Sequence, residues 1–325
     1  MKKSRVLIVD ALNAFFRGYI VDPSLSSNGQ PVGGIRGFLR ILQTTVRDTK
    51  PDKIVIAWDG QGGSRRRRTV NSNYKQGRKP IRLNRAIRNL TEDEEVNNKV
   101  WQQKRLMEYL NNMPVTQTFV PEIEADDVIA YISQMPSLKE SQKVIMSQDQ
   151  DFFQLCDDKT VLFRPIKKQV LNKKSITDEY GIHPVNFALA RAMAGDKSDN
   201  LPGVPGVGLA TLAKRMPFLA EDRSVFIDEV IDYCEGVEKK LKFHNAILEH
   251  RDRIEENYQI MQLYAPSMSP QAKEQVRWAI ENSGRDFNKT EIVKMMAVDG
   301  FGMGQYDSWA DLFCVLKKIS VANDN

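Results

Sequence analysis

Three short runs of consecutive apolar residues constrain the fold of this chain more than any other feature: residues 6–9, 54–58 and 144–146. A run that is apolar at every position is typical of a β-strand buried on both faces of a parallel sheet. Residues 11–19 and 37–49, between the first two runs, have helical patterns. The sequence therefore predicts an α/β fold in which helices flank a mostly parallel central sheet.

Acidic residues follow each of these runs. Asp10 and Asp59 come directly after the first two, and Asp149 and Asp151 follow the third. Because ligands gather beyond the carboxyl ends of parallel strands, we expect these side chains to share one crevice. A single aspartate after a strand is more often a turn former or a helix cap. Three strands that all end this way favour a common acidic site.

A helix predicted to start near residue 124 supplies three more carboxylates, Glu124, Asp126 and Asp127. The helix macrodipole favours acids in a first turn, and for an isolated triplet that explanation suffices. Beside the other acids, the triplet instead predicts a divalent metal site, because crowded carboxylates stay ionised only when cations neutralise them. Oxygen ligands of this kind suit Mg²⁺ or Mn²⁺.

Cysteine and histidine are too sparse and scattered to build a site of another kind. The chain has three of each, without CxxC spacing or a histidine cluster, which argues against zinc, a disulfide framework and a Ser-His-Asp triad. No window approaches the ~18 apolar residues of a membrane span, and no signal peptide precedes the first run. We therefore expect a monomeric cytoplasmic protein (in the host cytoplasm if viral) that binds no membrane.

Residues 60–90 lack any acid and carry a dense positive charge, from Arg65, Arg66, Arg67, Arg68, Lys75, Arg78, Lys79, Arg82, Arg85 and Arg88. Such a run is usually a solvated surface, but one this one-sided predicts a polyanionic partner. Its glycines favour a partly flexible segment that becomes ordered on binding. The acidic residues 92–95 that follow are interpreted as the N-terminal cap of a helix.

A glycine-rich turn at residues 203–208 follows Asp196 and Asp199 closely. Glycines at this spacing between helical stretches let backbone N–H groups approach phosphates, which is a helix-hairpin-helix pattern that reads no base sequence. A Gly/Pro-rich turn is normally only a turn, but its place directly after the acids favours duplex binding. Beyond about residue 223 the chain is predicted to be helical.

Taken together, these segments resemble the 5′-nuclease superfamily of flap endonucleases and 5′→3′ exonucleases. They are most similar to the free-standing bacteriophage RNase H enzymes of the T-even kind. The resemblance covers residues 4–216 in order and includes the motifs Ile8-Val9-Asp10, Ala57-Trp58-Asp59, Tyr74-Lys75-x-x-Arg78, Glu124-Ala125-Asp126-Asp127, Ser147-Gln148-Asp149-Gln150-Asp151-Phe152 and Gly195-Asp196-Lys197-Ser198-Asp199-Asn200. The departures are Gln148, Gln150 and the arginine run at residues 65–68.

The resemblance implies a role for each matching residue. Two Mg²⁺ ions, for which Mn²⁺ can substitute, would be held by Asp10, Asp59, Glu124, Asp126 and Asp149 (mainly the first ion) and by Asp127, Asp151, Asp196 and Asp199 (the second). Catalytic roles fall to Lys75, Arg78, Asp126 and Asp149. Nucleic acid would be contacted by Tyr74, Lys75, Arg78, Gly203, Gly206, Gly208, Lys214 and Arg215, and the turn could also hold K⁺. Tyr74 could stack on a frayed base, and as a lone aromatic it could equally be a packing residue.

The expected protein has an α/β nuclease domain at residues 1–180, with an arch-like basic segment at 60–95. Residues 181–325 would form the helix-hairpin-helix region and a helical C-terminal part. The expected activity is that of a 5′→3′ exonuclease and 5′ flap endonuclease with RNase H activity, which removes primers and flaps during replication and is encoded by a bacteriophage. Expected partners are branched or nicked DNA, RNA–DNA hybrids, and replication proteins such as a single-strand binding protein or a clamp.

Two alternatives remain open. A PIN-like ribonuclease shares a sheet with an acidic edge, but it would lack the turn at 203–208 and the segment at 74–78. A non-catalytic protein that binds branched DNA is opposed by the complete set of acids.

Overall fold

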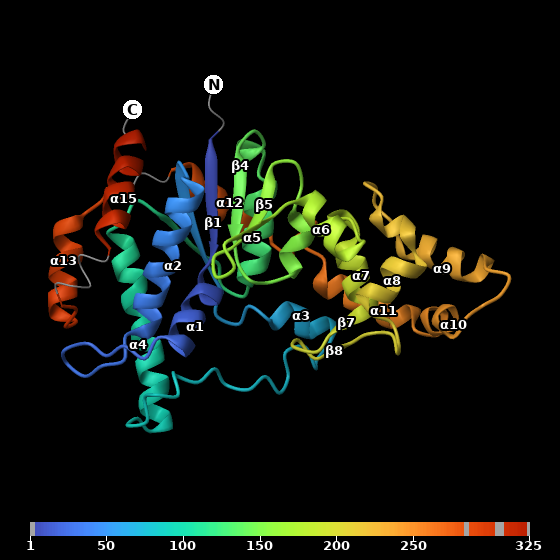
Figure 1. The fold of residues 1–325 in the computed structure, drawn as a ribbon, viewed down its shortest axis with the longest axis horizontal. Helices are drawn as coiled ribbons and strands as arrows, with labels where there is room; N and C mark the ends of the chain where they lie inside the picture. Colours follow the sequence, from blue (N-terminus) through green and yellow to red (C-terminus); the bar gives the residue numbers. More distant parts are fainter. Residues whose placement is uncertain (1–3, 283–285, 303–308, 324–325) are drawn as a thin grey trace.

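A six-stranded sheet forms the centre of the computed structural model, which describes residues 4–282, 286–302 and 309–323 (Figure 1). The strand order is β3-β2-β1-β4-β5-β6, and every neighbouring pair is parallel except β5 and β6. The strands are β1 (Arg5–Asp10), β2 (Lys53–Trp58), β3 (Thr116–Phe119), β4 (Gln142–Met146), β5 (Thr160–Arg164) and β6 (Gln169–Leu171). The prediction of a mostly parallel central sheet is confirmed.

The three apolar runs are the three innermost strands. In β1 the side chains of Leu7 and Val9 enter one core and those of Val6 and Ile8 enter the other, as the period of two along a strand requires. Leu7, Ile8 and Val9 are all 0% exposed. Burial on both faces therefore explains why the central positions of β1, β2 and β4 carry only apolar residues, with polar residues confined to the strand ends.

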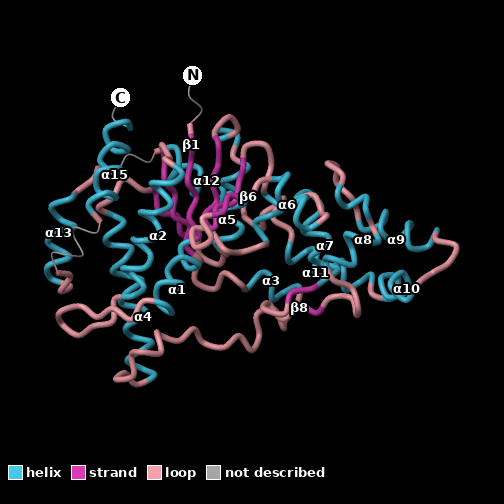
Figure 2. Tube along the Cα trace, in the orientation of Figure 1, coloured by secondary structure: helices cyan, strands magenta, loops and turns pink. Residues whose placement is uncertain are grey.

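Helices cover both faces of the sheet (Figure 2). One face packs against α1 (Ala11–Val21), α2 (Gly33–Thr49), α4 (Glu92–Asn111), α13 (Lys289–Val298) and α15 (Ala310–Asn323). The other packs against α5 (Ala125–Gln134), α7 (Phe187–Ala194) and α12 (Pro270–Glu281). Strands β1, β2 and β3 follow one another toward one edge of the sheet. The polypeptide then crosses back and adds β4 on the other side of β1. This reversal creates a crevice between β1 and β4 at the carboxyl edge.

The remaining elements extend to one side of the sheet or bridge to it. They are α3 (Arg65–Val70), α6 (Lys173–Tyr180), β7 (Gly195–Asp196), β8 (Leu201–Pro202), α8 (Leu209–Arg215), α9 (Ile227–Gly236), α10 (Lys242–Glu249), α11 (Arg251–Met261) and four short 3₁₀ helices (Pro136–Leu138, Asp151–Leu155, Pro184–Asn186 and Pro217–Ala220). Within the described residues, no helix is both long and apolar enough to cross a bilayer.

Helix starts and ends agree with most of the sequence expectations. The acids at residues 92–95 lie in the first turn of α4, where Thr91 and Glu94 form a capping box, as interpreted from the sequence. The helix predicted to start at residue 37 begins earlier, since α2 starts at Gly33. Packing is the reason, because Gly33 and Gly34 are buried against α1 and α4, where no larger residue fits.

Helices α1 and α2 cross with their backbones in contact at Gly18 and Gly37. A Cβ atom built on Gly37 would lie 2.3 Å from the Cα of Gly18. The Gly37→Ala variant must push the helices apart, and we expect it to lower the free energy of unfolding by about 1–3 kcal/mol. Urea unfolding measures this effect. Gly236→Ala is the matched control, because nothing lies within 4 Å of that position, and equal stability of the two variants would contradict the prediction.

Candidate active site

The carboxyl ends of β1, β2 and β4 bring three aspartates to the crevice. Asp10 ends β1 and caps α1, where its Oδ1 accepts a hydrogen bond from the Asn13 amide at 3.2 Å. Its Oδ2 accepts one from the Ser147 hydroxyl at 2.8 Å, which ties β1 to the loop after β4. Asp59, directly after β2, accepts from the Ala125 amide at 2.8 Å and so fixes the start of α5. Asp149 lies two residues beyond Ser147 and is exposed.

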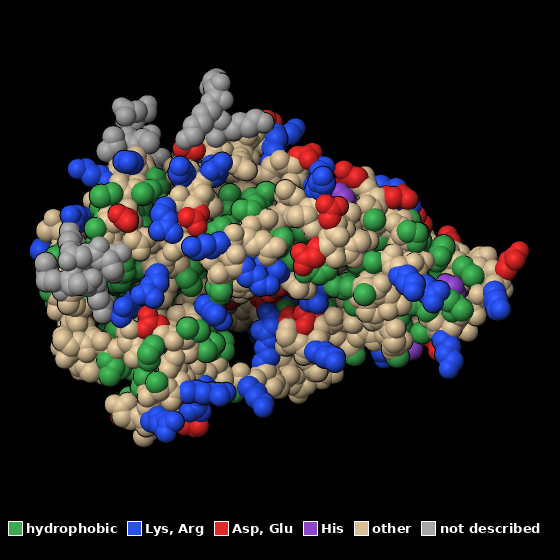
Figure 3. Space-filling view, viewed as in Figure 1, with side chains coloured by type: hydrophobic (Ala, Val, Ile, Leu, Met, Phe, Trp, Pro, Cys, Tyr) green, Lys and Arg blue, Asp and Glu red, His purple; other side chains and the backbone are tan. Residues whose placement is uncertain are grey.

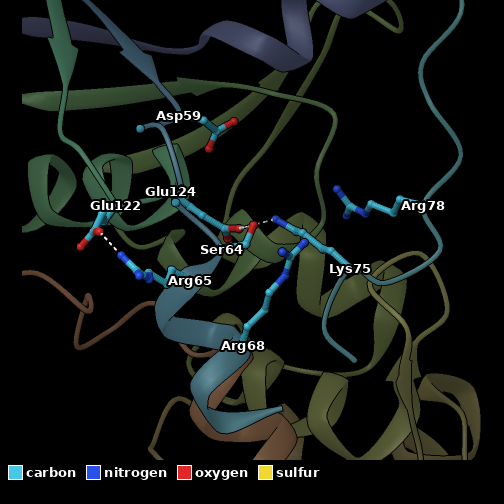
Figure 4. A pocket seen from close by; sticks show the side chains of 11 residues that line it. Asp59, Ser64, Arg65, Arg68, Lys75, Arg78, Glu122 and Glu124 are labelled. Atoms are coloured by element: carbon cyan, nitrogen blue, oxygen red, sulfur yellow. Dashed lines mark hydrogen bonds and ion pairs between the residues drawn. The ribbon is translucent and has the colours of Figure 1, made fainter. Parts of the chain in front are cut away.

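Glu124, the N-cap of α5, is 2% exposed and is held by side chains of the basic segment. Its carboxylate accepts hydrogen bonds from Ser64 (2.7 Å), Lys75 (2.7 Å), Arg67 (2.8 Å) and the hydroxyl of Tyr74 (3.1 Å). Burial acts to raise the pKa of Glu124, but Lys75 and Arg67 outweigh it and lower that pKa to about 2. Glu124 is therefore ionised at neutral pH, and its ion pairs hold the basic segment at the edge of the sheet (Figure 4).

Arg67 holds the Glu124 carboxylate in place through a second set of buried contacts. Its guanidinium is buried, bridges Glu124 and Asp127 (2.6 Å to Asp127), and donates to the Ile260 carbonyl at 2.9 Å. The other oxygen of Asp127 accepts from the Ser267 amide at 2.9 Å. Both oxygens of Asp127 thus bind protein groups, and in this structure the side chain joins α5 to the C-terminal helices. Its assignment to the second metal ion stays a prediction.

A second group of acids lies where the 3₁₀ helix of residues 151–155 meets the β7–β8 hairpin. Arg191 of α7 forms ion pairs with Asp151 (3.2 Å) and Asp196. Ser198 donates to Asp196 from its amide and its hydroxyl, both at 2.7 Å, and Asp199 is paired with Arg78. Residues far apart in the sequence therefore converge here through α7 and the hairpin.

The two groups form one continuous row of interacting acids, called here the acidic row: Asp59, Asp10, Glu124, Asp126, Asp149, Asp151, Asp196 and Asp199. Burial raises the pKa of Asp10 to about 7, and the charges of Asp59 and Asp149 add to the shift. Burial and the charge of Asp149 likewise raise the pKa of Asp151 to about 7. Burial raises the pKa of Asp126 well above its ordinary value, Lys75 opposes this rise, and the charges of Asp149, Glu124 and Asp10 add to it.

This donor set fits divalent cations. All its ligands are hard oxygens, and repulsion between the carboxylates adds to burial in raising the pKa values of Asp10, Asp126 and Asp151, an effect that a divalent cation would counteract. In residues 4–282, 286–302 and 309–323, no three acidic, histidine or cysteine side chains already form a tight coordination cluster. Lys75, Arg78 and Arg191 hold oxygens that an ion would use, so metal binding requires small side-chain rearrangements.

The basic segment forms one wall of a pocket of about 620 Å³ beside the acidic row. Arg65, Arg68, Lys75 and Arg78 line it together with Asp59, Glu122 and Glu124, and Arg65 and Lys75 are paired with Glu122 and Glu124 (Figure 4). The surface is also hollowed below the sheet, with Lys and Arg side chains around the opening (Figure 3). A phosphate entering this pocket would meet cations on one side and the acidic row on the other.

Of the two roles open to Tyr74, stacking on a base and packing, the structure has the packing role. Tyr74 is 3% exposed, its hydroxyl donates to Glu124, and the Lys75 ammonium lies 4.9 Å from its ring centroid. Because the ring is buried, no free face is available here for stacking on a base. In this structure Tyr74 instead orients Glu124.

The glycine-rich turn connects β8 to α8. Gly203 is packed so closely that an added Cβ would lie 2.2 Å from the Ala194 carbonyl oxygen, which explains glycine there. Gly206 has φ +74°, and nothing lies within 4 Å of a Cβ at Gly206 or Gly208. These two backbones are therefore open to solvent. Lys214 and Arg215 lie in the last turn of α8.

Sequence reasoning did not single out Arg67 or Arg191. Arg67 is hidden in a run of four arginines, and only the packing of α3 against α11 distinguishes it from its exposed neighbours. Arg191 lies in an apolar helix, where a lone charged residue among alanines and methionines was an available signal.

Residues 5–181 match the family model described as the 5′-3′ exonuclease N-terminal resolvase-like domain. The 5′-3′ exonuclease of Aquifex aeolicus is 29% identical over 209 residues, which are 63% of this chain and 66% of that protein. The 5′-3′ exonuclease of Buchnera aphidicola subsp. Schizaphis graminum is 30% identical over 213 residues, 65% of this chain and 69% of that protein. A thermostable DNA polymerase I of Thermus thermophilus is 28% identical over 245 residues, 74% of this chain but 27% of the polymerase. The match therefore spans about two thirds of each exonuclease and about a quarter of the polymerase.

Solved structures show the same fold. The 5′-exonuclease of bacteriophage T5 with bound divalent zinc ions aligns with a TM-score of 0.64 and 17% identity, over 91% of this chain and 98% of that one. The T5 flap endonuclease in a pseudo-enzyme-product complex with DNA and metal ions also gives 0.64 and 17%, over 90% and 99%. At this identity the likeness concerns the fold.

Proposed function

This chain belongs to the family of 5′-3′ exonucleases, and from that premise we propose that it is a metal-dependent 5′ nuclease. Its substrates would be 5′ flaps, nicks and RNA- or DNA-primed 5′ ends. The observation that carries the proposal is the acidic row at the carboxyl edge of the sheet, faced by Lys75 and Arg78 from the basic segment.

Two Mg²⁺ ions, or Mn²⁺ in their place, would be bound by the acidic row. Asp10, Asp59, Glu124, Asp126 and Asp149 would mainly serve the first ion, and Asp151, Asp196 and Asp199, together with Asp127 outside the row, would serve the second. Such ions supply a hydroxide at neutral pH and neutralise charge on the attacking and leaving oxygens. The acids of the protein would hold the ions in place, and Asp10 lies buried at the end of β1.

Lys75 and Arg78 would bind the scissile phosphate. Both cations are already at the site, paired with Glu124 and Asp199. A bound metal ion would compete for those carboxylates and leave the cations available to the phosphate. Their positive charge would then stabilise the additional negative charge of the transition state.

The glycine-rich turn would hold the duplex beside the cleaved end. Its open backbone at Gly206 and Gly208 suits close approach of a phosphate, and carbonyls of the turn could hold K⁺. Lys214 and Arg215 would add contacts to the phosphate backbone. Removal of RNA primers from RNA–DNA hybrids during phage replication, together with a single-strand binding protein or a clamp, is the role that fits these substrates.

The test compares 5′-labelled flap DNA, nicked duplex and RNA–DNA hybrid, with and without Mg²⁺. We expect short 5′ products only when the metal is present, released near the junction of the flap. Binding without cleavage, in Mg²⁺ and in Mn²⁺, would identify a non-catalytic branched-DNA binding protein. Equal cleavage of unstructured single-stranded RNA would identify a PIN-like ribonuclease.

A further inference from the structure

The turn that carries Lys75 is attached to the loop between β7 and β8. The Lys75 amide donates to the Asp199 carbonyl at 2.8 Å, and the Asn200 side-chain amide donates to the Asn73 carbonyl at 3.0 Å. Arg78 adds a hydrogen bond from its Nε to the Ser198 carbonyl at 3.0 Å. Figure 1 shows the segment after α3 running beside β7 and β8. The loop between β7 and β8 therefore holds the part of the basic segment that carries Lys75 and Arg78.

Both sides of this contact have left-handed backbones. Lys75 has φ 56° and Asn200 has φ 58°. Asparagine tolerates this conformation well, whereas for lysine it is uncommon and unfavourable. The surroundings must hold Lys75 in place, and the contacts of Asp199 and Asn200 with residues 73–75 are suited to do so.

The same loop leads rigidly into the glycine-rich turn. Asn200 is followed by β8, where Leu201 is 2% exposed, and then by Gly203, whose backbone packs on Ala194. The next residue, Val204, donates from its amide to the Met193 carbonyl at 2.8 Å. No flexible linker separates Asn200 from the backbone that would bind the duplex.

We propose that Asn200 is a positioning residue that fixes Lys75 relative to the duplex-binding turn. The β7–β8 loop, β8 and the glycine-rich turn act as one rigid unit. A duplex bound at residues 203–208 would therefore place its scissile phosphate next to Lys75. Asn200 touches neither the phosphate nor the acids directly and acts through the turn at residues 73–76. This inference rests on the proposed function for its consequence, but the contact itself is independent of it.

Asn200→Gly is the sharpest variant, because glycine keeps the left-handed backbone and removes only the side-chain donor. We expect the single-turnover rate of flap cleavage to fall about tenfold, with DNA affinity unchanged within about twofold, because a small misplacement of a catalytic cation costs rate and not binding. Asn282→Gly is the matched control. Its side chain likewise donates one exposed hydrogen bond, to the Trp278 carbonyl at 3.0 Å, far from the basic segment.

A double-mutant cycle with Lys75→Ala separates positioning from a general structural effect. If Asn200 acts through Lys75, adding Asn200→Gly to Lys75→Ala should lower the remaining rate by less than about twofold. The same tenfold loss in both backgrounds would overturn the proposal, and so would a loss confined to affinity.

Amide hydrogen exchange provides a readout that does not depend on cleavage. Without DNA, residues 73–78 should exchange about tenfold faster in Asn200→Gly than in the wild type and in Asn282→Gly, because the turn is released from the loop. Unchanged protection would overturn the proposal. If the wild type cleaves none of the substrates with Mg²⁺ or Mn²⁺, the proposed function fails while exchange still decides the role of Asn200.

Discussion

The Asp126→Asn variant is expected to lose at least about 10³-fold in the rate of flap cleavage while it binds flap DNA as tightly as the wild type. Asp126 lies among Asp10, Glu124 and Asp149, and its carboxylate pKa is raised by burial and by its acidic neighbours. Asparagine keeps the volume and removes the charge that would bind a divalent ion. Loss of several kcal/mol of metal-ion catalysis corresponds to this factor.

Single-turnover cleavage in saturating Mg²⁺, together with a binding titration in a chelator, measures the two quantities separately. Asp149→Asn should behave in the same way. Asp93→Asn is the matched control, since Asp93 is an exposed acid in the first turn of α4, away from the crevice. Turnover at the wild-type rate in Asp126→Asn would refute the metal-binding role of the acidic row.

The Lys75→Ala variant is expected to lower the chemical step about 10²–10³-fold, the usual loss when one preorganised donor to a developing negative charge is removed. Lys75 is only 17% exposed in its side chain and lies 2.7 Å from Glu124, so it is desolvated where the phosphate would bind. The fold should survive, because Arg67, Tyr74 and Ser64 still donate to Glu124.

DNA affinity should change by less than about threefold in Lys75→Ala, because other cations of the segment supply most of the attraction to the phosphate backbone. Lys79→Ala, four residues along the same segment and exposed, is the control for loss of one positive charge. Equal losses in rate and affinity would show that Lys75 only binds a phosphate and does not stabilise the transition state.

The sequence predicts those parts of the sheet that are buried on both faces. The strands β1, β2 and β4 each contain an uninterrupted apolar run and could be recognised directly. The edge strand β3 reads Thr-Gln-Thr-Phe and was missed, because an edge strand packs on fewer neighbours and needs no apolar run. Strand β6 pairs antiparallel with β5 and forms a hairpin at the other edge of the sheet.

The acids of the candidate site could be found because they follow strands and helix starts at positions that the topology brings together. The cations that hold these acids in this structure could not be found in the same way. Arg67 reaches Glu124 and Asp127 only because α3 packs against α11, and Arg191 reaches Asp151 only because α7 lies beside the short helix of residues 151–155. Such contacts depend on tertiary packing, which no local pattern encodes.

The carbonyl of Ile260 and the amide of Ser267 complete the hydrogen bonding of Arg67 and Asp127. During translation, the ribosome must therefore release the polypeptide well past residue 260 before this buried ion pair can be completed. A fragment ending at the glycine-rich turn would carry the whole acidic row but would lack both α11, which buries Arg67, and the Ile260 carbonyl that accepts a hydrogen bond from it. The part of the chain that carries the acidic row therefore depends on residues beyond the glycine-rich turn. Fusions or truncations that keep only the motifs lose the contacts of Ile260 and Ser267 with Arg67 and Asp127.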